Sequence, residues 1–375
     1  MISVTLTSSA LVLFALDLDA TIVDINLIRV VTIVIPLLLQ LPMGVVSDRL
    51  GRRPLILVNQ FTSLLSVVVR SLSQNPMHLI ASSLIRGVGG GIFFPQLLSL
   101  IGDLTGAGER STVINRFYLV SSLGMMIGPG VASLLLTRVS LRTLFVIETG
   151  VRLFMAAVVI VWLRRVPEAQ SIREPQEGYG ENVRRLLGRR NMLTVIEMAG
   201  CFSFFRAVVA TYTPIYARNV VGLSDSAIVL FGTFNGAAVF LSRTSLDRFI
   251  RKIGHKRLLL SMLVVCCIIG FTMPFAHGFA PLAVEMVLMG VTIGVLEPLG
   301  SIIVAHTTSR HERGFGNALN SFMKSLGSIS TIVLVSVAAG PSMVSVFPLG
   351  ALLPLISLGA SQLLMEPLAD VESEE

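Results

Sequence analysis

Ionisable side chains stand inside several of the most apolar stretches of this 375-residue chain. Glu297 and Lys324 are two of them, and they lie at similar depth in successive stretches. A charge costs about 2.5–3.5 kcal/mol at the centre of a lipid-embedded helix, so such residues face a partner or a water-filled cavity. Burial favours the neutral form of a carboxyl group, whereas a nearby ammonium group favours its charged form. Glu297 and Lys324 are therefore either a proton-binding pair or a static buried ion pair.

Further charged residues interrupt apolar stretches elsewhere in the chain. Arg206, near the middle of its stretch, either binds an anionic substrate or serves as a structural partner for a carboxylate or for carbonyl groups. Arg86 and Asp19 are placed where they can pair with each other across a cavity. Glu148 and Arg152 are four residues apart, which puts them on one face of a helix, so we expect them to form a structural pair.

The composition predicts an integral membrane protein. Hydrophobic residues make up 53% of the chain and charged residues only 14%, with a mean hydropathy of +0.81. A soluble domain needs a larger polar surface than this. Apolar runs of roughly 20 residues recur, each long enough to cross the hydrocarbon core. In lipid the backbone must satisfy its own hydrogen bonds, so these runs are expected to be helices.

The sequence predicts neither an enzyme nor a nucleic-acid-binding protein. The formal net charge is +7, but the basic residues sit in short loops, where they set topology and meet anionic lipid headgroups. The three cysteines, Cys201, Cys266 and Cys267, show no metal-ligand spacing. We find no nucleophile–base constellation and no glycine-rich phosphate loop preceding a lysine. We therefore expect no cofactor and no metal.

Twelve transmembrane helices are predicted, in two sets of six. The long polar stretch 164–191 is the expected cytoplasmic linker, and residues 366–375 are the expected acidic cytoplasmic tail. The expected domains are thus an N-terminal six-helix bundle over 1–163 and a C-terminal six-helix bundle over 192–365. The predicted spans are 1–16, 25–47, 54–73, 77–101, 113–136, 142–163, 192–216, 225–244, 258–276, 281–304, 315–338 and 343–365.

The basic residues also predict the orientation. Roughly two-thirds of the 29 lysines and arginines fall in the loops after the even-numbered helices and beside 110–116 and 310–313. Loops rich in lysine and arginine remain in the cytoplasm. We therefore expect both termini to be cytoplasmic, in the cell (inner) membrane of a prokaryote.

The two halves of the chain repeat at an offset of 203 residues, with Gly87 matching Gly290 and Pro95 matching Pro298. Such a repeat relates two six-helix units by an axis along the membrane normal. We expect an all-α fold of two pseudo-symmetric bundles around a central cavity. The offset also makes the first helix about a third shorter than its partner. Either the chain begins downstream of the true start, or this helix sits short in the bilayer.

A charged segment, GVVSDRLGRR, occupies residues 44–53, and a degraded copy returns as a loop at 245–257. The segment fits Gly-x-x-x-Asp-Arg-x-Gly-Arg-Arg, and through it the chain resembles the major facilitator superfamily over nearly its whole length. The resemblance implies that Asp48 bridges to the other half when the cytoplasmic side is closed; the alternative is that the loop only enforces topology. The expected gating residues are Gly44, Asp48, Arg49, Gly51, Arg52, Arg53, Asp247 and Arg248.

The fifth predicted helix contains GMMIGP at 124–129, which resembles the motif of the family's proton-coupled drug exporters. Gly124 and Gly128 share a face that permits close helix contact, and Pro129 can bend the helix. These residues either seal the cavity against leak or serve ordinary packing. The motif usually closes with two glycines, whereas Ala132 and Ser133 stand here.

A second family motif is displaced in this chain. Its arginine usually sits where Ser83 stands, three residues before Arg86, so the proton-relay role of that arginine does not transfer simply to Arg86. This departure and the one in the fifth helix weaken the resemblance to antiporters without removing it.

Three functions fit these features. The first is a monomeric secondary active exporter that exchanges protons for a small amphipathic compound. The second is uptake or exchange of a small organic anion, which Arg206 and Lys324 favour. The third is a non-transporting membrane sensor, which predicts ligand binding without flux.

Overall fold

The computed structural model describes the backbone of residues 6–7, 10–50, 52–104, 110–163, 186, 188–308, 313–338 and 343–366. The side chains of residues 40–52, 91–112, 114–115, 118, 313–315 and 332–343 lie outside that description. The chain divides by its contacts into two compact units. Unit 1 is Met1–Glu174 with Ala217–Thr233, and unit 2 is Pro175–Tyr216 with Phe234–Glu375.

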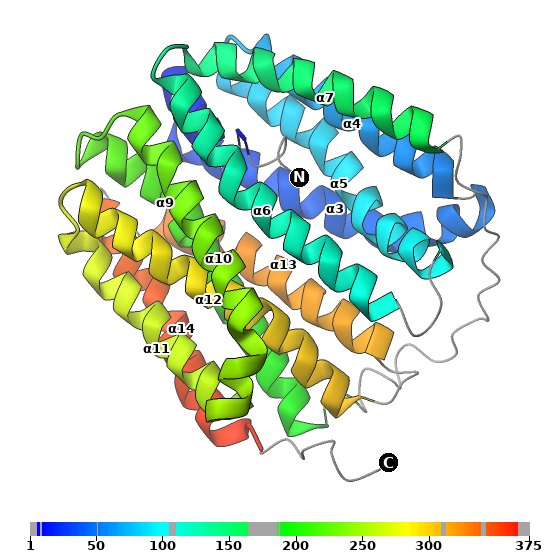
Figure 1. Ribbon diagram of the computed structural model, residues 1–375. Helices are drawn as coiled ribbons and strands as arrows, with labels where there is room; N and C mark the ends of the chain where they lie inside the picture. The colour runs from blue at the N-terminus through cyan, green and yellow to red at the C-terminus, as the bar shows by residue number, and fades with distance from the viewer. Residues whose placement is uncertain are drawn as a thin grey trace. The chain divides into compact units, whose positions relative to one another are not determined.

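The described residues form helices and no strands (Figure 1). The prediction of an all-α membrane fold is confirmed. Each predicted span overlaps one helix, although of the span 1–16 only the part from Ala10 is described as helix. The helices of the first half are α2 (Ala10–Asp17), α3 (Ile22–Leu50), α4 (Arg52–Ser71), α5 (Pro76–Leu104), α6 (Arg110–Leu136) and α7 (Leu141–Leu163). Those of the second half are α9 (Arg190–Asn219), α10 (Asp225–Ile253), α11 (His255–Thr272), α12 (Phe279–Thr307), α13 (Arg313–Ala338) and α14 (Val346–Leu364), with 3₁₀ turns at Met273–Phe275 and Met343–Ser345.

Length and capping explain these helices. Nine of the described helices are long and apolar enough to cross a membrane. A capping box opens α3: the amide of Asp24 donates to Thr21 Oγ1 at 3.2 Å, and the amide of Thr21 donates to Asp24 Oδ2 at 2.9 Å. At the start of α5, the amide of His78 donates to Asn75 Oδ1 at 3.1 Å, directly after the turn signal at Asn75-Pro76.

Close helix contacts hold unit 1 together. Helix α4 packs against both α5 and α7 (Figure 1), and α3 packs against α5. The contact between α4 and α5 depends on Gly89, because a Cβ there would lie 2.4 Å from Thr62 Oγ1. Asn59 Nδ2 donates to the carbonyl of Gly89 at 2.7 Å and so joins the same two helices. Only a glycine permits this approach.

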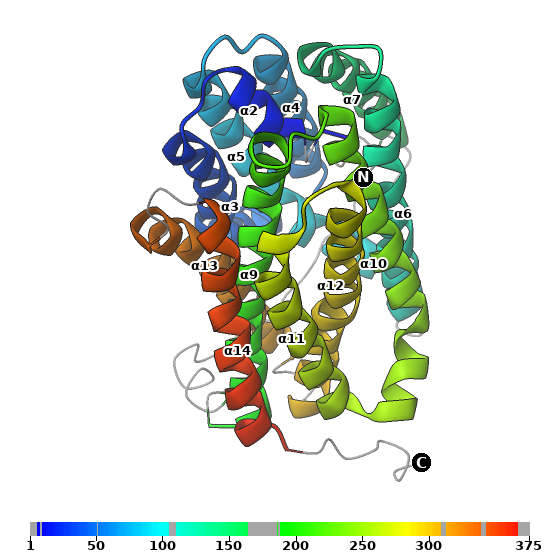
Figure 2. The same cartoon turned by 90° about the vertical axis from the view of Figure 1, so that its left-hand side faces the viewer.

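Glycines play the same part in unit 2, where α11 packs against α12 and α14 (Figure 2). A Cβ on Gly290 of α12 would lie 2.4 Å from the carbonyl oxygen of Asn235 in α10. A Cβ on Gly327 of α13 would lie 2.0 Å from the carbonyl oxygen of Gly200 in α9. Small residues let helix backbones approach closely, and the packing contacts that result help to drive helix association in lipid.

The structure corrects one boundary. We expected a charged loop at 245–257, but α10 continues to Ile253 and α11 begins at His255. The break occurs at Gly254, whose φ of 78° is a conformation that favours glycine. Between Ser245 and Ile253 the sequence holds no glycine or proline, so nothing ends the helix earlier, although the residues are charged. Charge was therefore a poor guide to the end of this helix.

Candidate functional site

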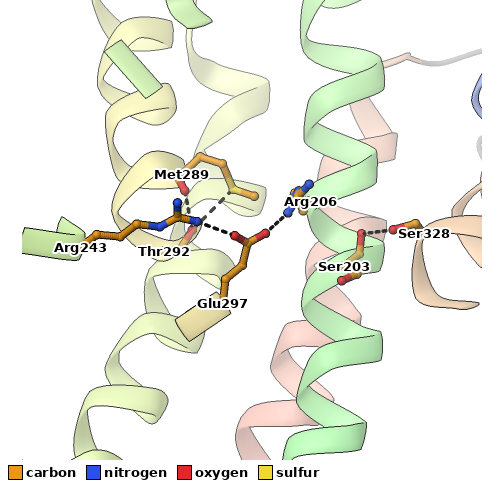
Figure 3. Close-up of polar contacts among 7 residues, drawn as sticks. All are labelled: Ser203, Arg206, Arg243, Met289, Thr292, Glu297 and Ser328. Carbon is orange, nitrogen blue, oxygen red and sulfur yellow. Dashed lines mark hydrogen bonds and ion pairs between the residues drawn. The ribbon is translucent and has the colours of Figure 1, made fainter. Parts of the chain in front are cut away.

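The centre of the site is Glu297 of α12, whose carboxylate lies between two guanidinium groups (Figure 3). Arg243 of α10 donates from Nη2 to Oε2 at 2.8 Å. Arg206 of α9 donates from Nη1 to Oε1 on the other side. All three residues belong to unit 2, so three helices that are separate in the sequence contribute one charged cluster.

The two arginines differ in exposure. The side chain of Arg206 is 46% exposed, whereas those of Glu297 and Arg243 are 25% and 15% exposed. Arg243 thus anchors the carboxylate from the packed side, and Arg206 approaches it from an open side. Charge-assisted bonds of this kind are about twice as strong as neutral ones, and a guanidinium can hold a carboxylate by two donors.

Lys324 of α13 completes the cluster electrostatically. Its charge acts on Glu297, as do those of Arg206 and Arg243, but no ion pair within 4.0 Å joins it to that carboxylate among the described residues. The direct partners of Glu297 are therefore the two arginines. These four residues carry three positive charges and one negative charge, an excess that favours an anionic group nearby.

Sequence reasoning missed one partner of Glu297, Arg243, and one further carboxylate within a predicted span, Glu197. Arg243 stood at the cytoplasmic end of the predicted span 225–244 and was counted with the basic residues of the following loop, whereas α10 runs on to Ile253. Glu197 lies in α9, where Ser357 Oγ donates to Oε2 at 3.1 Å and Cys201 Sγ donates to Oε1 at 3.6 Å. Its position inside the span 192–216 was the signal that could have revealed it.

Polar groups link the site helices at other points. Ser328 Oγ of α13 donates to the carbonyl of Ser203 in α9 at 3.4 Å (Figure 3). Thr331 Oγ1 donates to the carbonyl of Phe204 at 3.1 Å. These bonds fix α13 against α9, the helix that presents Arg206, and thereby position Lys324 on the same side of unit 2.

Asp19 and Arg86 of unit 1 do not form the pair that the sequence led us to expect. Asp19 is exposed in the turn after α2, with φ 57°, and no ion pair joins it to Arg86 among the described residues. Arg86 Nη1 instead donates to Ser63 Oγ at 2.6 Å. The carboxylates that do form ion pairs here are Asp17 and Asp225, both with Arg218.

The local pair in α7 is confirmed. Arg152 Nε donates to Glu148 Oε1 at 2.9 Å, and Thr7 Oγ1 donates to the other oxygen of Glu148. Because α7 positions both charged residues four apart, their spacing in the sequence was sufficient to predict the contact.

The gating segment is described only in part. The side chains of Gly44, Asp48, Arg49 and Arg52 lie outside the described residues, as does Gly51 entirely. The backbone places Asp48 in the last turn of α3 and starts α4 at Arg52, and Arg53 is half-buried. In the second copy, Asp247 and Arg248 are exposed on α10. The gating role of these eight residues stays a prediction.

The small residues of α6 lie on a packed face. Gly124, Gly128 and Pro129 are buried, and α6 continues as a helix through Pro129. Further along, Ser133 Oγ donates to the carbonyl of Ser226 at 2.8 Å, and Ser226 Oγ returns a bond to the carbonyl of Ser133 at 2.8 Å. This face of α6 therefore makes close contact with the start of α10, inside unit 1.

Comparison with known proteins decides the family. The model of the Major Facilitator Superfamily matches residues 1–332. The chain belongs to the Major Facilitator Superfamily. It is a multi-pass membrane transporter of small molecules, not an enzyme, and the resemblance seen in its sequence is confirmed.

Its relatives are distant in sequence. Multidrug resistance protein 1 of Bacillus subtilis is 22% identical over 286 residues, which is 75% of this chain and 72% of that protein. Multidrug resistance protein MdtG of Yersinia enterocolitica is 23% identical over 319 residues, covering 84% of this chain and 76% of that protein.

Two solved structures share the fold. The crystal structure of nucleoside transporter NupG has a TM-score of 0.76 at 12% identity, over 97% of both chains. A bacterial homolog of the human lysosomal transporter Spinster has a TM-score of 0.74 at 12% identity, over 99% of this chain and 95% of that one. At this identity the likeness concerns the fold alone.

Proposed function

We propose that this transporter exports small amphipathic compounds in exchange for protons, by alternating access between two six-helix bundles over 1–163 and 192–365. It acts as a monomer in the bacterial inner membrane, with both termini in the cytoplasm. Relatives named multidrug resistance proteins support export. The motif Gly124-Met-Met-Ile-Gly-Pro129 of α6 supports coupling to protons.

The contact of Arg206 with Glu297 carries the proposal. Arg206 is the more exposed of the two arginines, so it is the one that a substrate can reach. A polar or anionic group of the substrate competes with Glu297 for its guanidinium, while Arg243 keeps hold of the carboxylate. Binding of a proton to Glu297 would weaken the same contact. Substrate and proton thus act on one ion pair, which is the basis of coupling.

The gate is assigned to the charged segments. Asp48 stands at the C-terminal end of α3, where the helix dipole disfavours a carboxylate unless a cation or the N-terminus of another helix faces it. We assign Asp48 to a latch that closes the cytoplasmic side, with Asp247 and Arg248 as the corresponding part of the second half. In the same assignment, the glycines at 44 and 51 would allow the backbones to approach closely.

The positive charge of the cluster favours a second candidate, uptake or exchange of a small organic anion. Arg206, Arg243 and Lys324 outnumber the single carboxylate of Glu297. A carboxylate-bearing solute would be attracted to such a site, whereas a lipophilic cation would be repelled by it.

Transport into proteoliposomes with an imposed pH gradient tests the proposal. The panel contains a lipophilic cation, a neutral amphipathic compound and a small dicarboxylate. We expect the pH gradient to drive the amphipathic compounds, and Glu297→Gln to abolish the effect of the gradient while Glu197→Gln retains it. Transport of the dicarboxylate alone would replace the proposal by the second candidate. Proton coupling would be refuted if a compound were transported at the same rate with and without the pH gradient. Binding of a compound without flux would indicate a sensor.

A further inference from the structure

A second cluster of charged residues lies in unit 1. Arg70 of α4 and Arg86 of α5 each bond a serine of the other helix, and the pair of Arg152 with Glu148 lies on α7, which packs against α4. Arg70 is only 8% exposed, Arg152 9% and Glu148 1%. The close packing of α4 with α5 and with α7 brings these residues together (Figure 1).

The cluster is not balanced in charge. The single carboxylate, Glu148, is bonded by Arg152 at 2.9 Å. Arg70 Nε donates to the neutral hydroxyl of Ser82 at 3.1 Å, and Arg86 donates to the neutral hydroxyl of Ser63. Within the described part of the chain, the only negative charge that acts on Arg70 and Arg86 is that of Glu148. Arg70 is buried and Arg86 is half-buried. Buried charges are ordinarily paired, so two guanidinium groups that bond only neutral serines favour a further anion between them.

Two buried serine hydroxyls indicate a position for such an anion. Ser66 and Ser83 are fully buried, and their Oγ atoms have no hydrogen-bond partner among the described residues. Ser66 lies one turn from Arg70 on α4, and Ser83 lies one turn from Arg86 on α5, so each hydroxyl shares a helix face with an arginine. Buried hydroxyls without partners are rare and call for a bound group.

We propose that a small inorganic anion of the chloride class binds between α4, α5 and α7, held by Arg70 and Arg86 with hydroxyl donors from Ser66 and Ser83. The guanidinium groups are positively charged and supply only N–H donors, and each hydroxyl can add one O–H donor, so the site suits an anion and repels a cation. The close approach of α4 to α5 at Gly89 favours a compact ion over a phosphate or a lipid headgroup. This site is independent of substrate transport at Glu297.

The test measures the thermal unfolding midpoint of the purified full-length protein in neutral detergent, with sodium chloride or sodium gluconate at equal ionic strength. We expect chloride to raise the midpoint by about 3 °C at ten times its dissociation constant. Arg86→Gln and the double variant Ser66→Ala, Ser83→Ala should lose this rise. Arg138→Gln removes an exposed charge from the same unit and should keep it.

A second measurement does not depend on the variants. Crystals of the unaltered protein grown in bromide should show an anomalous scattering peak within hydrogen-bond reach of Arg70 and Arg86. Equal midpoints in chloride and gluconate, a chloride effect that persists in Arg86→Gln, or the absence of a bromide peak between these helices would overturn the proposal. A larger effect of phosphate than of chloride would reject the assignment to a compact ion.

Discussion

Replacing Glu297 by glutamine removes one charge and almost no volume, which makes it the most direct probe of the site. Arg243 and Glu297 are 15% and 25% exposed, so their pair is largely withdrawn from water. Breaking a fully buried pair costs about 3–5 kcal/mol, and breaking an exposed pair costs about 0–1 kcal/mol. Arg206 is 46% exposed, so its ion pair with Glu297 contributes little to the free energy of unfolding. We therefore expect Glu297→Gln to destabilise the protein by about 2 kcal/mol.

The assay is the thermal unfolding midpoint of the purified protein in detergent. At roughly 2 °C per kcal/mol for a large chain, the midpoint should fall by about 4 °C. Glu197→Gln is the matched control, because Glu197 accepts bonds from the neutral groups of Ser357 and Cys201. The amide oxygen of a glutamine can accept one of these bonds, and its NH2 group can donate to the serine hydroxyl. Its midpoint should stay within about 1 °C of the unaltered protein.

A double-mutant cycle decides whether the effect comes from the ion pair. Glu297→Gln leaves the charge of Arg243 without this partner. Arg243→Met, added to Glu297→Gln, should therefore lower the stability much less than it does alone, with a coupling energy of about 1–2 kcal/mol. Strict additivity of the two changes would show that Glu297 does not stabilise the protein through Arg243. An equal fall in Glu197→Gln would show that any buried carboxylate matters, and the reasoning would be refuted.

Three more predictions concern other residues. Arg206→Ala should raise the KM for substrate roughly tenfold with the midpoint nearly unchanged, whereas Arg243→Ala should lower the midpoint; equal effects on stability would contradict the division of roles. Gly327→Ala should cost about 1–3 kcal/mol through collision with α9, while Gly150→Ala, with nothing within 4 Å, should be neutral or stabilising in the same unfolding assay. Asp48→Asn should slow transport several-fold at normal protein yield, and unchanged flux would argue against a latch.

Several features of the protein were accessible from sequence because they depend on local chemistry. Apolar runs of membrane length predicted the long helices, nine of which, among the described residues, can cross a membrane, since lipid permits few other backbone structures. The pair of Glu148 with Arg152 followed from a spacing of four on one helix. The motif at 44–53 was sufficient to indicate the family, which the match over residues 1–332 established.

The partners of Glu297 required the tertiary structure. We expected Lys324 to be the partner of Glu297, because the depth of a residue along its helix can be estimated from sequence. Contact between two side chains also depends on the rotation of each helix and on its axial position against its neighbours. Because α10 extends to Ile253, Arg243 lies well inside the helix rather than at its predicted end, and its side chain contacts Glu297.

The sequence by itself thus determined the membrane helices, the family and the positions of the intramembrane charges. The choice of partners among those charges was decided only by the packing of the helices. An apolar periodicity specifies which residues are buried, yet many helix rotations bury them equally well. Close contacts at glycines such as Gly290 and Gly327 select one rotation and one register, and those contacts exist only in the folded chain.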